Sequence, residues 1–407
     1  MTDAFTAKRY RSERLFRGLG AAALAVTVVF LLYLVVDIAI KAWPSFFEST
    51  VTLQANIDPT RVDKANVAKG DFSGLLKDAI RAEFPGVTER AEKKKVAALL
   101  SIGAADDLRY QIISDPSSIG TTITTEALLN DGADLYLKGN VGGSGLAEQE
   151  QGYLNALRDK GLIKSHFATR FFTSGDSREP ELSGLRGAIT GSLLTLLMTL
   201  SLSVPLGIAA AVYLAEFAPK NRWTELIEVN INNLAAVPSI IFGLLGLAVF
   251  INFFGLPRSA PLVGGLVLAL LVLPTIIIAS RAALNAVPPS IKEAALGVGA
   301  SHQQAVFHHV LPLALPGILT GTILGVARAL GETAPLLMIG MVAFIVDIPK
   351  GFTEAATVLP VQIYLWSDLP EVAFQSRTAA AIIVLLVILF GFNAIAIYLR
   401  KRFERRW

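Results

Sequence analysis

Six long apolar stretches constrain this chain more than any other feature of its sequence. They cover roughly residues 18–40, 189–215, 231–254, 261–283, 316–345 and 377–399. A helix needs about 20 mostly apolar residues to cross the roughly 30 Å hydrocarbon core of a bilayer, and each stretch is long enough. Hydrophobic residues make up 53% of the 407 residues, a composition typical of polytopic membrane proteins. The sequence therefore predicts an all-α polytopic membrane protein with six transmembrane helices.

Basic residues flank the first and the last apolar stretch. The first cluster comprises Lys8, Arg9, Arg11, Arg14 and Arg17, and the second comprises Arg400, Lys401, Arg402, Arg405 and Arg406. The positive-inside rule places both clusters in the cytoplasm, which requires an even number of crossings. Residues 1–17 are then a cytoplasmic N-terminus and 401–407 a cytoplasmic tail. Residues 18–41 form a retained anchor, because their apolar run is longer than that of a signal peptide.

Residues 42–183 differ in composition from the rest of the chain and fall on the outer side of the membrane. They carry about half of all charges in about a third of the length, as suits one soluble domain. Ser49–Asp58 alternates apolar and polar residues like a strand, and Glu89–Ile102 is rich in helix formers. Lys138–Gly145 is rich in glycine and predicts a flexible loop. We expect an inserted α+β extracytoplasmic domain.

Several chemistries are excluded by what the sequence lacks. There is no cysteine, which rules out disulfides and thiol nucleophiles, and the four histidines have no metal-ligand spacing. No G-x-x-x-x-G-K-[ST] motif occurs, so the chain cannot bind ATP in the usual way. Neither an H-E-x-x-H motif nor a serine elbow is present. We therefore expect no cofactor, no metal, no nucleic acid and no catalytic activity in this chain.

The segment Val287–Ile318, between the fourth and fifth stretches, predicts two short cytoplasmic helices. Ser290 and Glu293 have the spacing of a capping box, and Gly299 is expected to end the first helix. An apolar face is predicted from the helical spacing of Ile291, Ala294, Ala295 and Val298. Ser301 and Gln304 cap a second helix, and Pro312 and Pro316 lead the chain back into the membrane. Physics alone leaves two interpretations open: a loop packed on the membrane domain, or a helix that docks in a groove of a partner.

The fifth apolar stretch contains two charged residues, Arg328 and Glu332. Four residues apart on one helix, they would share a face and could neutralise each other. Charged side chains inside membrane domains more often face an aqueous cavity and mark a transport path. The planar fork of arginine suits oxyanions, and Thr333 adds a hydroxyl at the same level. Both interpretations, a structural pair and an anion path, remain open on this basis.

The cytoplasmic segment resembles the EAA loop of ABC importer permeases. The matching residues are Glu293, Ala294, Ala295, Gly299, Leu311 and Pro312, while His309 stands where the pattern prefers isoleucine or valine. The resemblance implies that residues 288–312 couple the permease to a separate ATPase subunit.

Four further segments resemble the PstA family of phosphate ABC transporter permeases. They are "GAITGSLLTLLMTLSLSVPLGIAAAVYLAEF" (Gly187–Phe217), "NLAAVPSIIFGLLGLAVF" (Asn233–Phe250), "LVLPTIIIASRAALNAVPPSIKEAALGVGAS" (Leu271–Ser301) and "VLPLALPGILTGTILGVARALGETAPLL" (Val310–Leu337). The resemblance implies a type I ABC importer (MetI-like) permease fold over residues 184–400, five of whose helices follow the outer domain. It also implies that Arg328, Glu332 and Thr333 lie on the phosphate path. The large domain of residues 42–183 departs from ordinary members and resembles an extra N-terminal domain carried by some of them.

The family implies a specific set of partners in the bacterial inner membrane. They are a PstC-like second permease, a PstB-like ATPase dimer that binds ATP and magnesium, and a periplasmic phosphate-binding protein, with lipid around the helices. Within transport, the alternative cargo is another oxyanion such as sulfate, molybdate or phosphonate. A membrane-anchored sensor is a rival from another class, although five further spans and a coupling loop do not fit it.

Overall fold

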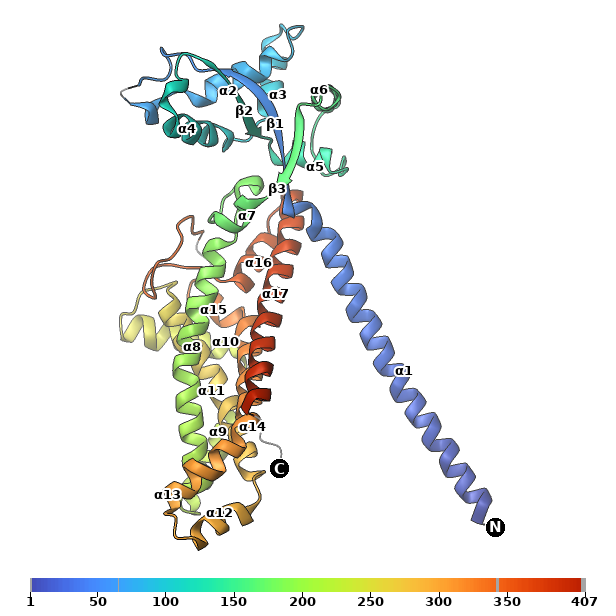
Figure 1. Ribbon diagram of the computed structural model, residues 1–407, viewed down its shortest axis with the longest axis vertical. Helices are drawn as coiled ribbons and strands as arrows, with labels where there is room; N and C mark the ends of the chain where they lie inside the picture. Colours follow the sequence, from blue (N-terminus) through green and yellow to red (C-terminus); the bar gives the residue numbers. More distant parts are fainter. Residues whose placement is uncertain (1, 65, 342–343, 404–407) are drawn as a thin grey trace.

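The computed structural model describes residues 2–64, 66–341 and 344–403. Figure 1 shows a small mixed domain at one end, an elongated bundle of helices below it, and one long helix that diverges from the bundle. The start of the helix Thr2–Ala42 and the end of the helix Val372–Phe403 both lie on the side away from the mixed domain. Arg405 and Arg406 of the predicted cytoplasmic tail lie outside the described residues.

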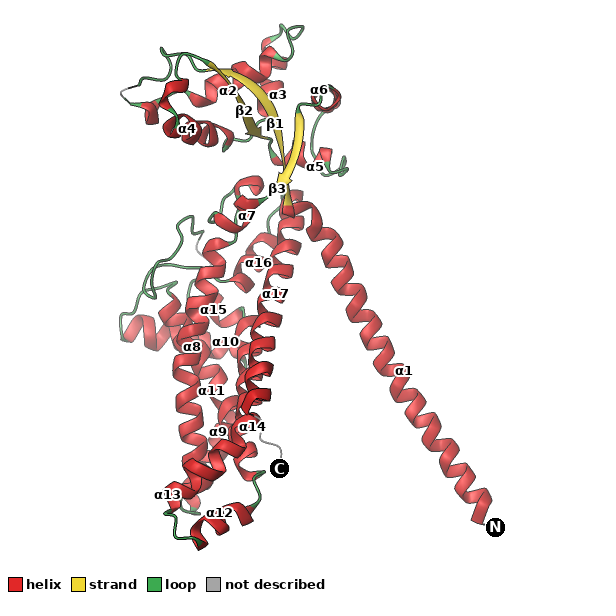
Figure 2. Cartoon of the chain, in the orientation of Figure 1, coloured by secondary structure: helices red, strands yellow, loops and turns green. Residues whose placement is uncertain are grey.

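The mixed domain is built on a three-stranded antiparallel sheet in the order β2-β1-β3 (Figure 2). The strands are β1 (Phe47–Asn56), β2 (Thr122–Leu128) and β3 (Ile163–Phe167). The helices are α2 (Phe72–Ala82), α3 (Arg90–Ala98), α4 (Ala104–Ser114), α5 (Asp131–Leu137), α6 (Glu148–Asp159) and α7 (Thr169–Thr173). The predicted alternation is confirmed, because Val51, Leu53 and Ala55 all lie in the core. The α+β character of this domain is therefore confirmed.

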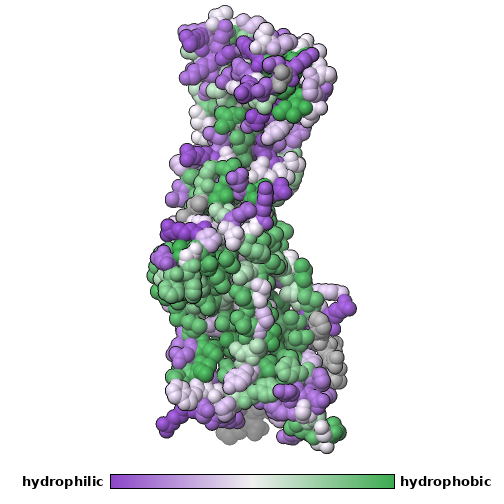
Figure 3. Space-filling model, turned by 90° about the vertical axis from the view of Figure 1, so that its left-hand side faces the viewer, coloured by the Kyte–Doolittle hydropathy of each residue, from purple (hydrophilic) through white to green (hydrophobic). Residues whose placement is uncertain are grey.

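The remaining helices form the membrane part, whose surface is largely apolar between two hydrophilic ends (Figure 3). The long helices are α1 (Thr2–Ala42), α8 (Arg186–Val212), α11 (Pro261–Asn285), α14 (Leu311–Gly331) and α17 (Val372–Phe403). The shorter ones are α9 (Arg222–Ala235), α10 (Ser239–Leu245), α12 (Pro289–Gly297), α13 (His302–Ala305), α15 (Ala334–Met338) and α16 (Leu359–Ser367). Helix α11 lies at the centre and packs against both α8 and α14.

Five helices among the described residues are long and apolar enough to cross a membrane, and a bent pair of helices brings the number to six if the pair is one broken span rather than a re-entrant loop. The bent pair joins α9 to α10 and the π-helical segment Gly246–Phe253, with an angle of 104° at the break. The prediction of one continuous helix over 231–254 is therefore wrong. Pro238 precedes α10 and has no N–H to continue the hydrogen bonds of α9, so the apolar composition hides a break.

The predicted span over 316–345 is confirmed as far as Gly331, within the apolar helix His302–Gly331, but its continuation to 345 is wrong, because α14 ends at Gly331. Glu332 has extended backbone angles, and the chain then forms only the short helix α15. Gly331 and Pro335 flank the break; proline cannot donate the hydrogen bond that a continuing helix needs. Residues 342–343 of this predicted span lie outside the described residues.

Candidate functional site

Arg328 and Glu332 meet at the broken end of α14. Arg328 lies in the last turn of the helix and Glu332 is the first residue beyond it. The Nε atom of Arg328 lies 3.6 Å from Oε1 of Glu332, and the two side chains are 34% and 19% exposed. The predicted proximity is confirmed, but its predicted reason is wrong, since the residues do not share a helix face. The pair is formed by the turn of the chain at the break, and part of the guanidinium is open to the surface of this subunit.

A second broken helix packs against this one. Gly243 of α10 lies so close to α15 that a Cβ atom there would be 2.7 Å from Cα of Pro335 and 2.8 Å from its carbonyl oxygen. The carbonyl oxygen of Thr333 accepts hydrogen bonds from the N–H groups of Leu336 and Leu337. The two breaks in the membrane part thus lie next to short helices that touch. Broken helices are a common way for membrane transporters to build polar sites at membrane depth.

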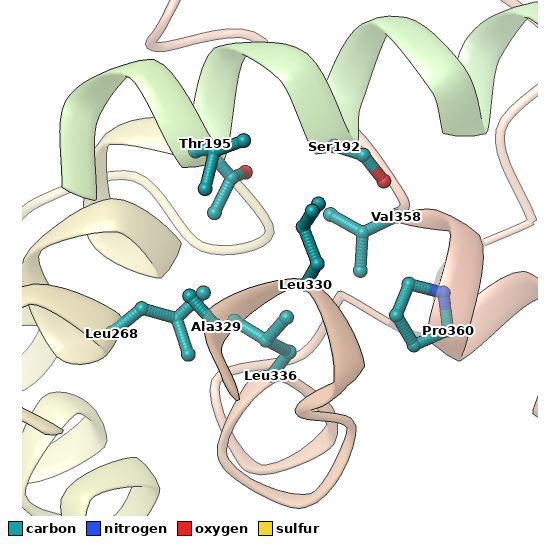
Figure 4. Close-up of a pocket in the computed structure, with 9 residues that line it drawn as sticks. Ser192, Thr195, Leu268, Ala329, Leu330, Leu336, Val358 and Pro360 are labelled. Carbon is teal, nitrogen blue, oxygen red and sulfur yellow. The ribbon is translucent and has the colours of Figure 1, made fainter. Parts of the chain in front are cut away.

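A small cavity lies between α8, α11, α14 and α15 (Figure 4). Its lining is mostly apolar and includes Leu268, Ala329 and Leu336, while Ser192 uses its hydroxyl to accept a hydrogen bond from the N–H of Leu359. Its volume of about 10 Å³ has room for a single water at most. This cavity fits neither phosphate nor another oxyanion, so Arg328 and Glu332 remain the candidate anion contacts.

The predicted coupling segment is a separate site at the other end of α14. Its first helix, α12, ends in a Schellman turn: Gly299 has φ of +91° and its N–H donates to Leu296, while the N–H of Ala300 donates to Ala295. The capping box at Ser301 and Gln304 is present at the start of α13. The predicted box at Ser290 and Glu293 is wrong, because the helix already begins at Pro289, whose fixed φ suits the first helical position.

The residues predicted to couple to an ATPase differ in exposure. Glu293, Ala294 and Gly299 are exposed, whereas Ala295 is buried and Leu311 and Pro312 lie half-buried at the start of α14. The residues of the predicted apolar face are not all buried, since Val298 is 88% exposed and Ala295 only 6%. Val298 and the neighbouring Leu296 leave an apolar surface at the tip of the loop, at the far end of the molecule from the mixed domain (Figure 1).

Glu216, in the π-helical segment Tyr213–Phe217 that continues α8, binds this loop, a contact that the sequence did not predict. The Nζ atom of Lys292 lies 2.5 Å from Oε2 of Glu216. Nε2 of His302 lies 2.9 Å from the carbonyl oxygen of Glu216, and the ring of His302 packs edge-on against Phe217. The sequence does show that Glu216 is an isolated acidic residue at the end of an apolar stretch. It does not show its partner, because Lys292 lies 76 residues away in the sequence.

The two sites lie at opposite ends of one helix. Helix α14 runs from Leu311 at the loop to Gly331 beside the ion pair, and its 21 residues span about 30 Å at 1.5 Å per residue. Helix α14 therefore connects the predicted coupling segment to the turn that carries Arg328. Among the described residues, no group of three or more His, Cys, Asp or Glu side chains could hold a metal ion.

Comparisons with known proteins divide the chain in two. Residues 203–407 match the family of binding-protein-dependent transport system inner membrane components, and residues 3–145 match a domain of unknown function, DUF3333. A probable ABC transporter permease protein of Bacillus subtilis, YqgI, is 35% identical over 174 residues, which are 42% of this chain and 58% of that protein. The phosphate transport system permease protein PstA 1 of Mycobacterium tuberculosis is 32% identical over 223 residues, which are 55% of this chain and 72% of that protein.

A solved structure, the inward-facing MetNI methionine ABC transporter, aligns with 17% identity and a TM-score of 0.43. The alignment covers 54% of this chain and 97% of the aligned chain.

Proposed function

Because the chain belongs to the binding-protein-dependent transport system inner membrane components, we propose that it is the permease subunit of an ATP-driven importer of inorganic phosphate. Within this family it is similar to phosphate permeases named PstA. The observation that carries the cargo assignment is the Arg328–Glu332 pair, partly open at a helix break within the apolar part of the chain.

The chemistry of the pair suits a protonated oxyanion. The guanidinium of Arg328 can donate parallel hydrogen bonds to two phosphate oxygens. Near neutral pH phosphate keeps at least one proton, which Glu332 can accept in a hydrogen bond. Sulfate carries no such proton, so the same carboxylate repels it. Thr333, the next residue along the break, supplies a hydroxyl that can turn toward the anion.

Transport further requires that the cytoplasmic loop be driven by nucleotide hydrolysis. We assign the contact with the ATPase to the exposed loop that carries Glu293, Ala294 and Gly299. Ala295 is buried beneath this loop, and Leu311 and Pro312 lie at the start of α14. A separate PstB-like ATPase dimer would bind ATP and magnesium and receive α12, whose apolar tip would enter its groove. The attachment of this loop to α8 through Glu216 would convert its displacement into a movement of the bundle.

The proposed assembly contains two further proteins. A PstC-like permease would complete the path on the open side of Arg328, and a periplasmic phosphate-binding protein would deliver the anion to the outer side. Both termini and the α12–α13 loop would then be cytoplasmic, and the DUF3333 region, apart from its anchor helix, would face the periplasm of a bacterial inner membrane. The first residues of α1 and the last described residues of α17 lie on the side of the molecule that carries α12, which supports this orientation (Figure 1).

Phosphate uptake by cells that lack this chain tests the proposal most directly. Wild-type chain should restore uptake, and Arg328→Ala should restore about tenfold less or worse, since hydrogen bonds to a charged group contribute about 1.5–3 kcal/mol. Arg328→Lys keeps the positive charge but lacks the planar guanidinium, so uptake by this variant should lie between that of the wild type and that of Arg328→Ala. The amount of each variant in the membrane is measured in parallel. Uptake by Arg328→Ala at the wild-type level would refute the assignment of the anion contact.

A further inference from the structure

The outer domain meets the membrane part around a buried arginine that the transport mechanism leaves unassigned. Arg377 lies in the second turn of α17 and is 6% exposed. Its Nη1 atom donates to the carbonyl oxygen of Ser183 at 3.2 Å, and Nη2 donates to that of Glu181 at 3.4 Å. The guanidinium also lies 5.2 Å from the centre of the Phe171 ring. One side chain of α17 thus holds both the segment that enters α8 and the short helix α7.

The outer domain supplies a second set of charged contacts at the same place. The Nζ atom of Lys138 forms an ion pair with Asp134 and donates to the carbonyl oxygen of Phe47 at 2.7 Å. The N–H of Ser49 donates to Oδ1 of Asp134 at 3.1 Å. These contacts fix α5 to the first residues of β1, which follow α1 after one short turn.

The two sets of contacts enclose a polar cavity of about 20 Å³. It is lined by side chains of the outer domain and of α17 together, among them Lys138, Glu181 and Arg377. The hydroxyl of Ser45 and one carboxylate oxygen of Glu181 are buried in this junction without a hydrogen-bond partner among the described residues. The cavity has room for about one water, and a sliding movement of the two surfaces would separate the buried guanidinium of Arg377 from its two carbonyl partners. A satisfied buried polar network of this kind favours one arrangement of the two surfaces, because the groups are costly to leave without partners.

We propose that Arg377 is a positioning residue that fastens the outer domain to α17, so that the domain and the outer ends of α1, α8 and α17 move as one rigid body during transport. The domain is then not a flexible spacer. A partner that holds it also holds α17, which packs against α14, the helix that carries Arg328. Figure 1 shows the base of the domain seated on the upper end of α17.

A disulfide across the junction tests the rigid body, since the chain contains no cysteine of its own. A Cβ atom at Gly143 would lie 2.8 Å from Cγ1 of Val372, so Gly143→Cys with Val372→Cys brings two thiols into close proximity. The loop that carries Gly143 is held to α5 by the hydrogen bond from the N–H of Asn140 to Leu135. In the intact membrane-embedded chain we expect nearly complete oxidation of the pair, with uptake of labelled phosphate within about twofold of the reduced state.

Two results would contradict the proposal that the outer domain and α17 move as one rigid body. One is a pair that fails to cross-link, and the other is a cross-link that abolishes uptake until a reductant restores it. The two single-cysteine variants serve as controls for oxidation itself. The measurement of phosphate uptake rests on the proposed function, whereas the yield of cross-linking does not depend on which anion is transported. Failure of phosphate uptake in the wild type would therefore leave the proposal to be decided by cross-linking yield and by the exchange measurement below.

Substitution of the arginine tests its own role. In the double-cysteine background, Arg377→Met should lower the rate of cross-linking at least about threefold, and Arg377→Lys should lower it less. Hydrogen exchange at Leu53, in the central strand, should stay slow in both variants, because the domain itself remains folded. Loss of protection at Leu53 would mean that Arg377 merely supports the fold of the domain, which would refute a positioning role. So would an unchanged cross-linking rate.

Discussion

The Nε atom of Arg328 lies 3.6 Å from Oε1 of Glu332, although the helix that carries the arginine ends one residue before the glutamate. This separation is longer than a charge-assisted hydrogen bond, so the contact is electrostatic rather than a hydrogen-bonded fork. The cation also lies in the last turn of α14, where the negative end of the helix dipole favours it. The geometry therefore explains how a membrane domain tolerates both charges while part of the guanidinium stays accessible.

Glu332→Gln should weaken the discrimination between phosphate and sulfate. The amide cannot repel a fully ionised anion, so competition by sulfate in an uptake assay should rise roughly tenfold, equivalent to about 1.4 kcal/mol. Glu371→Gln, which changes an exposed acid just before α17, is the matched control and should leave competition unchanged. If Glu332→Gln keeps both its phosphate flux and its preference over sulfate, Glu332 only orients Arg328.

The elements that the sequence predicts well are those set by local periodicity. The alternation in Ser49–Asp58 matches β1 because one face of that strand is buried in the core, where Leu53 is 1% exposed. The end of α12 at Gly299 was predictable because only glycine adopts φ of +91° without strain. In both cases the residues that carry the signal are neighbours along the chain.

The breaks and the long-range contacts could not be predicted in the same way. Apolar composition continues across Pro238 and across Glu332, because the backbone on both sides of each break stays inside the membrane part. Lys292 could be placed at the cytoplasmic end, but its choice of Glu216 depends on how α8 and α12 pack. The buried position of Arg377 depends on the outer domain and α17 together, which no local pattern specifies.

Gly299→Ala should impair coupling, and Gly297→Ala should not. A Cβ atom added at either glycine would meet nothing within 4 Å, but only Gly299 has a positive φ, of +91°. An L-residue in the left-handed region costs roughly 1–2 kcal/mol, so Gly299→Ala should shift α12 and lower uptake severalfold at equal membrane levels. Equal uptake by the two variants would show that the turn after α12 does not position the loop.

Gly243→Ala should disturb the packing of the two broken helices. The new methyl group would lie 2.7 Å from Cα of Pro335 and 2.9 Å from Cβ of Met338, so α15 must move away from α10. Since α15 follows directly on Glu332, we expect a severalfold loss of uptake with the chain still present in the membrane. Gly391→Ala is the control, because a methyl group there meets nothing within 4 Å on α17. Comparable uptake by both variants would show that this contact has no part in transport.

The junction below the outer domain should become more stable as the pH falls from about 7 toward 5. Burial raises the pKa of Glu48, although the nearby Arg170 and Arg377 partly oppose it. Burial also raises the pKa of Glu181, and the nearby Asp131 and Glu179 act in the same direction. A raised pKa means that the folded state binds the proton more tightly. The contribution to stability is therefore largest below the unfolded value of about 4.3 and is lost as pH rises through the folded pKa.

Lys138 titrates in a different range and does not reverse this trend. Its pKa is lowered by burial, so its charged form destabilises the folded state. This destabilisation is removed only as the pH rises toward its unfolded value of about 10.4. Glu126 has a pKa lowered by its hydrogen bond from Lys164, and its contribution is lost only in more acidic solution. Between pH 7 and 5 the buried glutamates should therefore dominate the pH dependence of the junction.

Hydrogen exchange of the amides around Ser49 and Ser183, corrected for the intrinsic effect of pH, measures this dependence. Protection should increase on acidification in the wild type, and it should become nearly independent of pH in the combined variant Glu48→Gln, Glu181→Gln. Glu126→Gln should retain the wild-type dependence, because that carboxylate lies on the exposed side of the sheet. Protection that stays constant or falls between pH 7 and 5 would contradict the prediction, because a carboxyl with a raised pKa binds its proton more tightly in the folded state and can only strengthen the junction on acidification.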